Sequence, residues 1–330
     1  MSEPNDNRGI RPLTAADLNA VVAIDARIGQ RRRPLFFERR LEAALREPRH
    51  FIYIGYEAAG TLLGYLHARL LEGEFGIEQR VAVLDSIGVD PDHQSHGIAA
   101  AMLRECERIL GRKGIGEIQT QVDWRNLPML RFLAAFGFLL APRQILERAV
   151  GYVDTNAGAE PTPPERLEKD YSDPSGDQPG ALARDVVFCR SLEQRDLAAL
   201  VRIDRRITGR EHAAFYERKL DQALHESGIR VSLVAEIDRQ VVGFVMARVD
   251  FGEFDRTEPT AVLDSIGVDP GFGHRLVGSA LLSQLLGNLA TLRCETIHTE
   301  IDANHYDLAR FLTRYAFKPA QALAFAKPLP

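Results

Sequence analysis

The sequence has 330 residues, of which 45% are hydrophobic, and a formal net charge of −5 at pH 7. This charge leaves no basic surplus for a nucleic-acid partner, and no apolar run approaches the roughly 20 residues that span a bilayer. The first residues lack the apolar core of a secretion signal, and three scattered cysteines favour a reducing, cytoplasmic setting with no metal site.

The apolar periodicity predicts the elements of the first 150 residues in chain order. Thr14 and Asp17 are typical of a helix start, and strands flank a short turn at residues 58–60. The expected order is β-α-α-β-β-β-α-β-α-β, a mixed α/β sheet with helices on its faces. After the first helix, the predicted ranges are a helix at 34–45, two strands within 50–71, a strand at 81–89, a helix at 97–110, a strand at 117–122, a helix at 127–136 and a strand at 145–150.

The ten residues AVLDSIGVDP occur at 82–91 and again at 261–270, an offset of 179 positions. The same offset aligns residues 11–138 with the second half of the chain without a gap. A unit of this length is a whole domain rather than a solenoid repeat. We therefore predict two tandem domains, residues 1–150 and 185–330.

Residues 151–184 carry five of the 17 prolines and few large aliphatic side chains. Such a segment buries too little apolar surface to offset its ordering entropy, which predicts a linker. The alternative is a segment that wraps the first domain, anchored by Leu167 and Tyr171.

The turn between the strand at 81–89 and the next helix is the best candidate site. Gly97 lies at the helix start, where backbone N–H groups have no partner within the helix and suit a phosphate. Ser95 and His96 offer further donors. The alternative is that Gly97 only caps the helix.

The stretch Gln94-x-x-Gly97-x-Ala99 resembles the Q/R-x-x-G-x-G/A signature of the GCN5-related N-acetyltransferase (GNAT) superfamily. The order of elements and the ending Gly137-Phe138 are also similar to that family. The resemblance implies acetyl-CoA in a V-shaped split between the fourth and fifth strands, and transfer of its acetyl group to an amine. The residues implied in cofactor binding are Ile87, Gly88, Val89, Gln94, Ser95, His96, Gly97, Ile98, Ala99 and Asn126.

Asp85, with Asp264 in the second copy, is the titratable side chain nearest the implied transfer point. It is a candidate general base, or it only bonds a neighbouring backbone N–H. Relatives often place a Glu two residues earlier, where this chain has Val83 and Val262. Many also place a Tyr as proton donor where this chain has Leu133 and Leu312, so the proton donor for the thiolate stays open.

The second copy departs from the signature because Leu276 stands at the position of Gly97. Its side chain is expected to occupy the space of the pyrophosphate, which predicts a degenerate second domain. The alternative is a register displaced by two residues, in which Arg275-x-x-Gly278 forms the loop.

Two charge clusters border the implied acceptor cleft: an arginine cluster that could attract an anionic group and a glutamate cluster that could attract a cationic amine. Both are alternatively solvated loops. Trp124 either forms a wall of the cleft or is half-buried in the core. The clusters consist of Arg31, Arg32 and Arg33, and of Glu72, Glu74 and Glu78.

Three functions fit the sequence: an N-acetyltransferase of a small-molecule or peptide amine, a non-catalytic acyl-CoA sensor, and a structural scaffold. The partners expected are the amine acceptor and, within the chain, a pseudo-dimer of the two domains. No nucleic acid, membrane or metal is expected.

Overall fold

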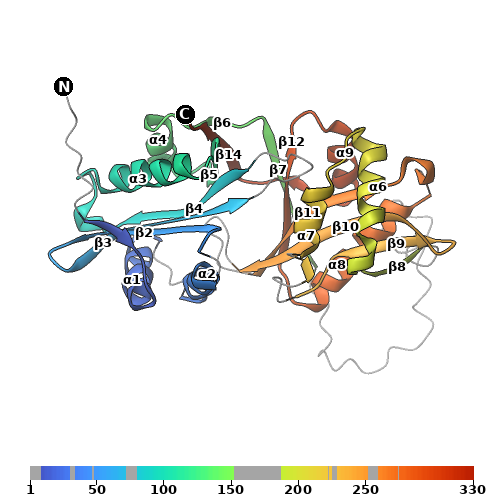
Figure 1. The fold of residues 1–330 in the computed structure, drawn as a ribbon, viewed down its shortest axis with the longest axis horizontal. Coiled ribbons are helices and arrows are strands. Elements are labelled where there is room, and N and C mark those ends of the chain that lie inside the picture. The colour runs from blue at the N-terminus through green and yellow to red at the C-terminus, as the bar shows by residue number, and fades with distance from the viewer. Residues whose placement is uncertain are drawn as a thin grey trace. The chain divides into compact units, whose positions relative to one another are not determined.

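The computed structural model describes residues 9–29, 34–46, 48–71, 80–151, 187–221, 223–224, 229–251, 259–273 and 275–330. The chain forms two compact units, each with a mixed seven-stranded sheet, as the repeat predicts (Figure 1). The predicted linker lies outside the described residues, apart from Gly151.

The elements of the first half follow the predicted order. They are β1 (Ile10–Pro12), η1 (Ala15–Asp17), α1 (Leu18–Gly29), α2 (Pro34–Arg46), β2 (Phe51–Ala58), β3 (Thr61–Leu71), β4 (Val81–Val89), η2 (Pro91–His93), α3 (Ile98–Arg112), β5 (Glu117–Asp123), α4 (Leu127–Ala135), β6 (Leu139–Leu140) and β7 (Arg143–Ala149).

The second half repeats these helices and strands at an offset close to 179 residues. They are β8 (Phe188–Ser191), η4 (Gln194–Asp196), α6 (Leu197–Thr208), α7 (Ala213–Asp221), β9 (Leu233–Ile237), β10 (Gln240–Phe251), β11 (Pro259–Val268), η6 (Pro270–Phe272), α8 (Val277–Thr291), β12 (Thr296–Asp302), α9 (Tyr306–Arg314), β13 (Lys318–Pro319) and β14 (Ala322–Pro328).

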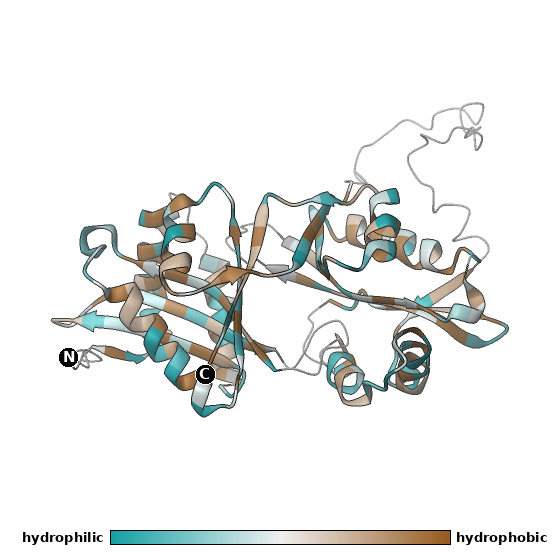
Figure 2. Cartoon of the chain, turned by 90° about the horizontal axis from the view of Figure 1, so that it is seen from above, coloured by the Kyte–Doolittle hydropathy of each residue, from teal (hydrophilic) through white to brown (hydrophobic). Residues whose placement is uncertain are grey.

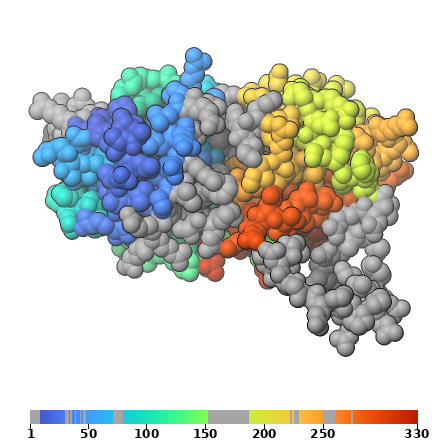
Figure 3. Space-filling view, turned by 90° about the horizontal axis from the view of Figure 1, so that it is seen from below, coloured from blue at the N-terminus to red at the C-terminus, as the bar shows by residue number. Residues whose placement is uncertain are grey.

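In unit 1 each face of the sheet is covered by helices with an apolar side. Leu66, Ala82 and Leu84 face Met102 and Leu103 of α3 on one side. Side chains of β2 and β3 face α1 and α2 on the other. Apolar and polar residues alternate along the helix ribbons (Figure 2). In the view from the side of α1 and α2, these helices supply the dark blue surface of unit 1 (Figure 3).

The last strand of each repeat belongs to the sheet of the other unit. The strand order is β1-β2-β3-β4-β5-β14-β6 in one sheet and β13-β7-β12-β11-β10-β9-β8 in the other. β14 pairs antiparallel with β5, from Ala322 opposite Asp123 to Pro328 opposite Glu117.

The compact units therefore differ from the predicted domains 1–150 and 185–330 at their ends. The first segment of unit 1 ends at Ile145 and its last segment begins at Pro319, and unit 2 begins at Leu146. The offset of 179 relates β7 to β14 residue by residue, so each strand fits either slot. A sequence pattern cannot choose between two equivalent slots.

Candidate functional site

The central feature of unit 1 is the separation of β4 from its parallel neighbour β5. The two strands pair at Ala82 with Ile118 and at Val83 with Gln119. At the next level the Thr120 hydroxyl donates to the Leu84 carbonyl at 2.9 Å. Ile87, Gly88 and Val89 lie beyond the paired part of β4, which agrees with the predicted split.

A β-bulge lies where the two strands begin to separate. Across the β3–β4 ladder, His67 is opposite Ser86 while the next residue, Ala68, is opposite Leu84. Asp85 is therefore the extra residue. A bulge bends its strand and changes the direction of the side chains around it.

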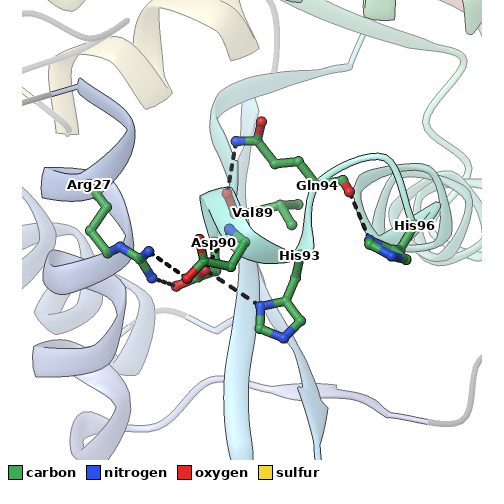
Figure 4. Close-up of polar contacts among 7 residues, drawn as sticks. Arg27, Val89, Asp90, His93, Gln94 and His96 are labelled. Atoms are coloured by element: carbon green, nitrogen blue, oxygen red, sulfur yellow. Dashed lines mark hydrogen bonds and ion pairs between the residues drawn. The ribbon is translucent and has the colours of Figure 1, made fainter.

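The loop between β4 and α3 is held by its own side chains (Figure 4). The Gln94 amide donates from Nε2 to the Val89 carbonyl at 3.2 Å, and His96 Nδ1 lies 2.7 Å from the Gln94 carbonyl oxygen. Ser95 and Gly97 have positive φ values of 64° and 80°. Gln94 therefore fixes the turn that leads from the split to the helix.

Gly97 leaves open space in front of the α3 N-terminus. A Cβ atom built on Gly97 would meet no heavy atom within 4 Å. The first helical hydrogen bond runs from Ala101 N to the Gly97 carbonyl, so the preceding N–H groups are not used within the helix. This combination of donors and space fits a phosphate group.

Arg27, near the end of α1, links this loop to the helix that covers the other face of the sheet. Its guanidinium pairs with Asp90 and, through Nη2, with Asp92 at 2.8 Å. His93 Nδ1 lies 3.5 Å from Asp90 Oδ1. The sequence analysis missed Arg27, although Arg206 is its counterpart and pairs with Asp269.

Asp85 lies in a buried ion cluster. Arg69 Nε donates to its Oδ1 at 3.0 Å, and Arg40 Nε is 4.0 Å from Oδ2. Within the described residues Oδ2 has no hydrogen-bond partner. In unit 2, Asp264 pairs with Arg248 and lies 3.7 Å from Lys219.

A row of aromatic and polar side chains extends from this cluster under α1 and α2. The Tyr65 hydroxyl donates to Asp25 Oδ1 at 2.9 Å, and Ser86 Oγ lies 3.4 Å from His67 Nδ1. The His67 ring stacks on Tyr53 with centroids 4.0 Å apart. The sequence analysis missed these residues; their signal was the alternation of polar side chains along β3.

Asn126 and Trp124 lie at the far edge of the split, after β5. Asn126 caps α4, since its Oδ1 accepts from Met129 N at 3.2 Å. Trp124 is 55% exposed rather than half-buried. Asn126 thus has a structural role whether or not its Nδ2 also contacts a ligand.

Two leucines and two cysteines lie in apolar surroundings. Leu133 and Leu312 are fully buried in the two cores, and neither donates a proton. Burial raises the pKa of the Cys106 thiol to about 12 and that of Cys189 to about 11. These thiols are protonated and unreactive at neutral pH.

Comparison with known proteins shows the family to which the chain belongs. The sequence profile of the acetyltransferase (GNAT) family matches residues 19–138 and again residues 197–317. The chain belongs to the GNAT family. It carries two GNAT repeats, as the resemblance implied. No curated protein sequence matches it.

Solved structures share this tandem fold at low identity. A tandem GNAT protein from the clavulanic acid biosynthesis pathway aligns with a TM-score of 0.63 at 12% identity, covering 97% of this chain and 98% of its own. A GCN5-related N-acetyltransferase from Sphaerobacter thermophilus aligns with a TM-score of 0.61 at 14% identity, covering 97% and 95%.

The second GNAT repeat keeps the split but changes the loop. β11 and β12 pair from Thr260 to Val262, and the Thr299 hydroxyl donates to the Leu263 carbonyl at 2.8 Å. Leu276 takes the left-handed conformation of Gly97, with φ 60° and 48% exposure. α8 begins at Val277 just as α3 begins at Ile98, so the displaced register is not adopted.

Several predictions fall on residues outside the described ranges. The arginine and glutamate clusters predicted to border the acceptor cleft are among them: Arg31, Arg32, Arg33, Glu72, Glu74 and Glu78. In the ranges that are described, no group of three or more His, Cys, Asp or Glu side chains could hold a metal ion. None of the described helices has the length and apolarity to cross a bilayer.

Proposed function

We propose that the chain is an acetyl-CoA-dependent N-acetyltransferase of a small-molecule or peptide amine, and that unit 1 carries the activity. GNAT proteins are acyl-CoA-dependent N-acetyltransferases, which supports the reaction class. The assignment of the activity to unit 1 rests on the loop before α3. Gly97 leaves the helix N-terminus open, whereas Leu276 places a side chain at the same point before α8.

The residues present fit acetyl-CoA. The backbone of Ile87, Gly88 and Val89 is the edge available to the pantetheine arm. The loop of Gln94, Ser95, His96, Gly97, Ile98 and Ala99 would hold the pyrophosphate, and Asn126 would contact the arm from the β5 side. The Val89 carbonyl already accepts from the Gln94 amide, and its second lone pair can accept from the arm.

Acetyl-CoA, when bound, supplies the acetyl group as a thioester. A carboxylate or imidazole beside the split takes a proton from the ammonium form of the acceptor. Asp85 stays a candidate for this step through Oδ2, because Oδ1 is occupied by Arg69. Arg31, Arg32, Arg33, Glu72, Glu74 and Trp124 stay candidates for acceptor binding.

Release of free CoA tests the reaction. The intact chain is incubated with acetyl-CoA and a panel of primary amines: amino sugars, polyamines, aromatic ethylamines, amino acids and peptides with free N-termini. CoA release that depends on an amine and yields its acetylated product supports the proposal. Acetyl-CoA binding with no amine-dependent release would instead indicate a non-catalytic acyl-CoA sensor.

A further inference from the structure

The two units share most polar groups on the face covered by α1 and α2, and by α6 and α7. Asp25, Asp85 and Ser86 recur as Asp204, Asp264 and Ser265. A difference in activity between the units must arise from positions at which they differ. Two such positions lie on β3: Tyr65 and His67 are replaced by Phe244 and Met246.

The change at Tyr65 is compensated by a helix residue. In unit 1 the Tyr65 hydroxyl donates to Asp25 at 2.9 Å. In unit 2 the Tyr216 hydroxyl donates to Asp204 at 3.2 Å, from the helix position that Phe37 has in unit 1. The buried aspartate keeps its donor in both units, so this hydroxyl serves the fold.

The change at His67 removes the imidazole beside the serine. Ser86 Oγ lies 3.4 Å from His67 Nδ1, whereas Ser265 lies beside the Tyr216 hydroxyl. Burial raises the pKa of Tyr216, and Asp204 raises it further, so this phenol stays protonated. Unit 1 has a base beside the serine of the bulge, and in unit 2 a phenol takes that place.

Ser86 and its neighbour His67 lie just beyond the paired part of β4 and β5. Ser86 directly follows the bulge and lies past Val83, the last β4 residue paired with β5. The His67 ring is fixed by its stack on Tyr53 and by the edge of Phe37, whose centroid is 5.4 Å away. The 3.4 Å separation is long, as such contacts often are without a ligand.

A small cavity lies beside the imidazole. It lies between the sheet and the two covering helices, with His67 and Tyr53 from the sheet and Asp17 and Thr14 from the start of α1. Its other lining residues are apolar.

We propose that Ser86 and His67 form a proton relay that prepares the acceptor amine in unit 1. This inference rests on the proposed acetyltransferase function. An N–H bond of the ammonium breaks as its proton moves to Ser86 Oγ, and the hydroxyl proton of Ser86 moves to His67 Nδ1. The neutral amine then forms the C–N bond, the C–S bond breaks, and the second amine proton goes to the departing thiolate.

The charges around His67 are already engaged. Asp85 lies between Arg69 and Arg40, Asp25 accepts from Tyr65, and Asp17 pairs with Arg11. Histidine is the side chain that ordinarily gains a proton near neutral pH. The groups that contact the His67 ring include Tyr53 of β2, Tyr65 of β3, Phe37 of α2 and Ser86 of β4, and Asp17 lines the same cavity.

The test replaces His67 by the residue of the other unit. His67→Met should lower kcat/KM for the fastest amine of the panel by about 10²–10⁴-fold and remove the acidic limb of its pH profile. Acetyl-CoA affinity and Tm should change little, because Met246 fills the same position in unit 2. Ser86→Ala should act in the same direction, while its matched control Ser265→Ala should leave the rate unchanged.

The relay is overturned if His67→Met keeps both the acidic limb and a rate within about twofold of wild type. An equal loss of rate in Ser265→Ala would also overturn it. If the wild-type chain acetylates no amine, the proposed function itself fails and the relay fails with it. If the wild-type chain acetylates an amine and His67→Met does so equally well, only the relay is refuted and the proposed function stands.

Discussion

Asp85 and Asp264 have the same surroundings in the two units. Each lies in a sheet strand beside an arginine of the neighbouring strand, Arg69 or Arg248, and beside a cation of the second helix. The cluster therefore does not depend on an intact cofactor loop. In each unit the aspartate balances the cations of the neighbouring strand and of the second helix.

Replacing either aspartate should destabilise its unit. Asp85→Asn leaves Arg69 without its ion pair in a buried site, which typically costs about 3–5 kcal/mol. Asp264→Asn is the matched variant in unit 2. Chemical unfolding of the two variants should show losses of similar size. A loss below about 1 kcal/mol in Asp85→Asn would contradict this role.

A second ion cluster recurs at the first strand of each repeat. Arg11 pairs with Asp17 at 2.7 Å and with Glu57, and Arg190 pairs with Asp196 at 2.8 Å and with Glu236. The Arg11 guanidinium holds the pKa of Asp17 well below its usual range, against the effect of burial. The pKa of Asp196 is also lowered.

These lowered pKa values predict acid sensitivity. A carboxylate with a depressed pKa in the folded state contributes stability above its unfolded pKa of about 3.9, and this contribution is lost as the pH falls. The urea midpoint should decline below about pH 5, and Asp17→Asn should decline less steeply. Parallel pH dependences of Asp17→Asn and wild type would refute this assignment.

At the scale of elements, the hydrophobic pattern predicted the helices and strands around the site, because each has an apolar side. The helix predicted at residues 97–110 is α3, and the strand at 81–89 is β4. The repeat offset also locates the start of α8. The ion partners of Asp85 and the His67 row were missed, because the alternation along β3 does not show which side chains the bulge brings together.

The hydroxyl of Thr120 marks the last contact between β4 and β5 before they separate. Thr120→Val should lower the stability of unit 1 by about 1–3 kcal/mol, since the buried Leu84 carbonyl loses its side-chain donor. Thr299→Val is the matched change in unit 2 and should have a similar effect there. No change in the thermal transition of either variant would show that these hydroxyls do not hold the base of the split.

For the whole molecule, the exchanged strands make each unit depend on both repeats. Lys327 of β14 donates from Nζ to Glu107 of α3 at 2.6 Å, and Arg148 of β7 donates to the Tyr315 carbonyl at 2.7 Å. β14 completes the sheet that contains the proposed cofactor site. Neither sequence repeat therefore forms a complete unit by itself in this arrangement.

Cysteine pairs can distinguish this exchange from closed repeats. Gln121 is opposite Ala324 in the β5–β14 ladder, whereas closed repeats would place Ile145 there. Oxidation of Gln121→Cys/Ala324→Cys should produce a disulfide-linked peptide pair on mass spectrometry. The control Gln121→Cys/Ile145→Cys should not. A link in the control alone would contradict the exchange.

The proposed function predicts that unit 1 alone binds acetyl-CoA, because Gly97 leaves its loop open and Leu276 places a side chain in the other loop. Calorimetric titration of acetyl-CoA into the intact chain, with Gly97→Leu and Leu276→Ala as paired variants, tests it directly. We predict one site per chain, lost in Gly97→Leu and retained in Leu276→Ala. Two sites in the wild-type chain, or a single site that survives Gly97→Leu, would contradict the account.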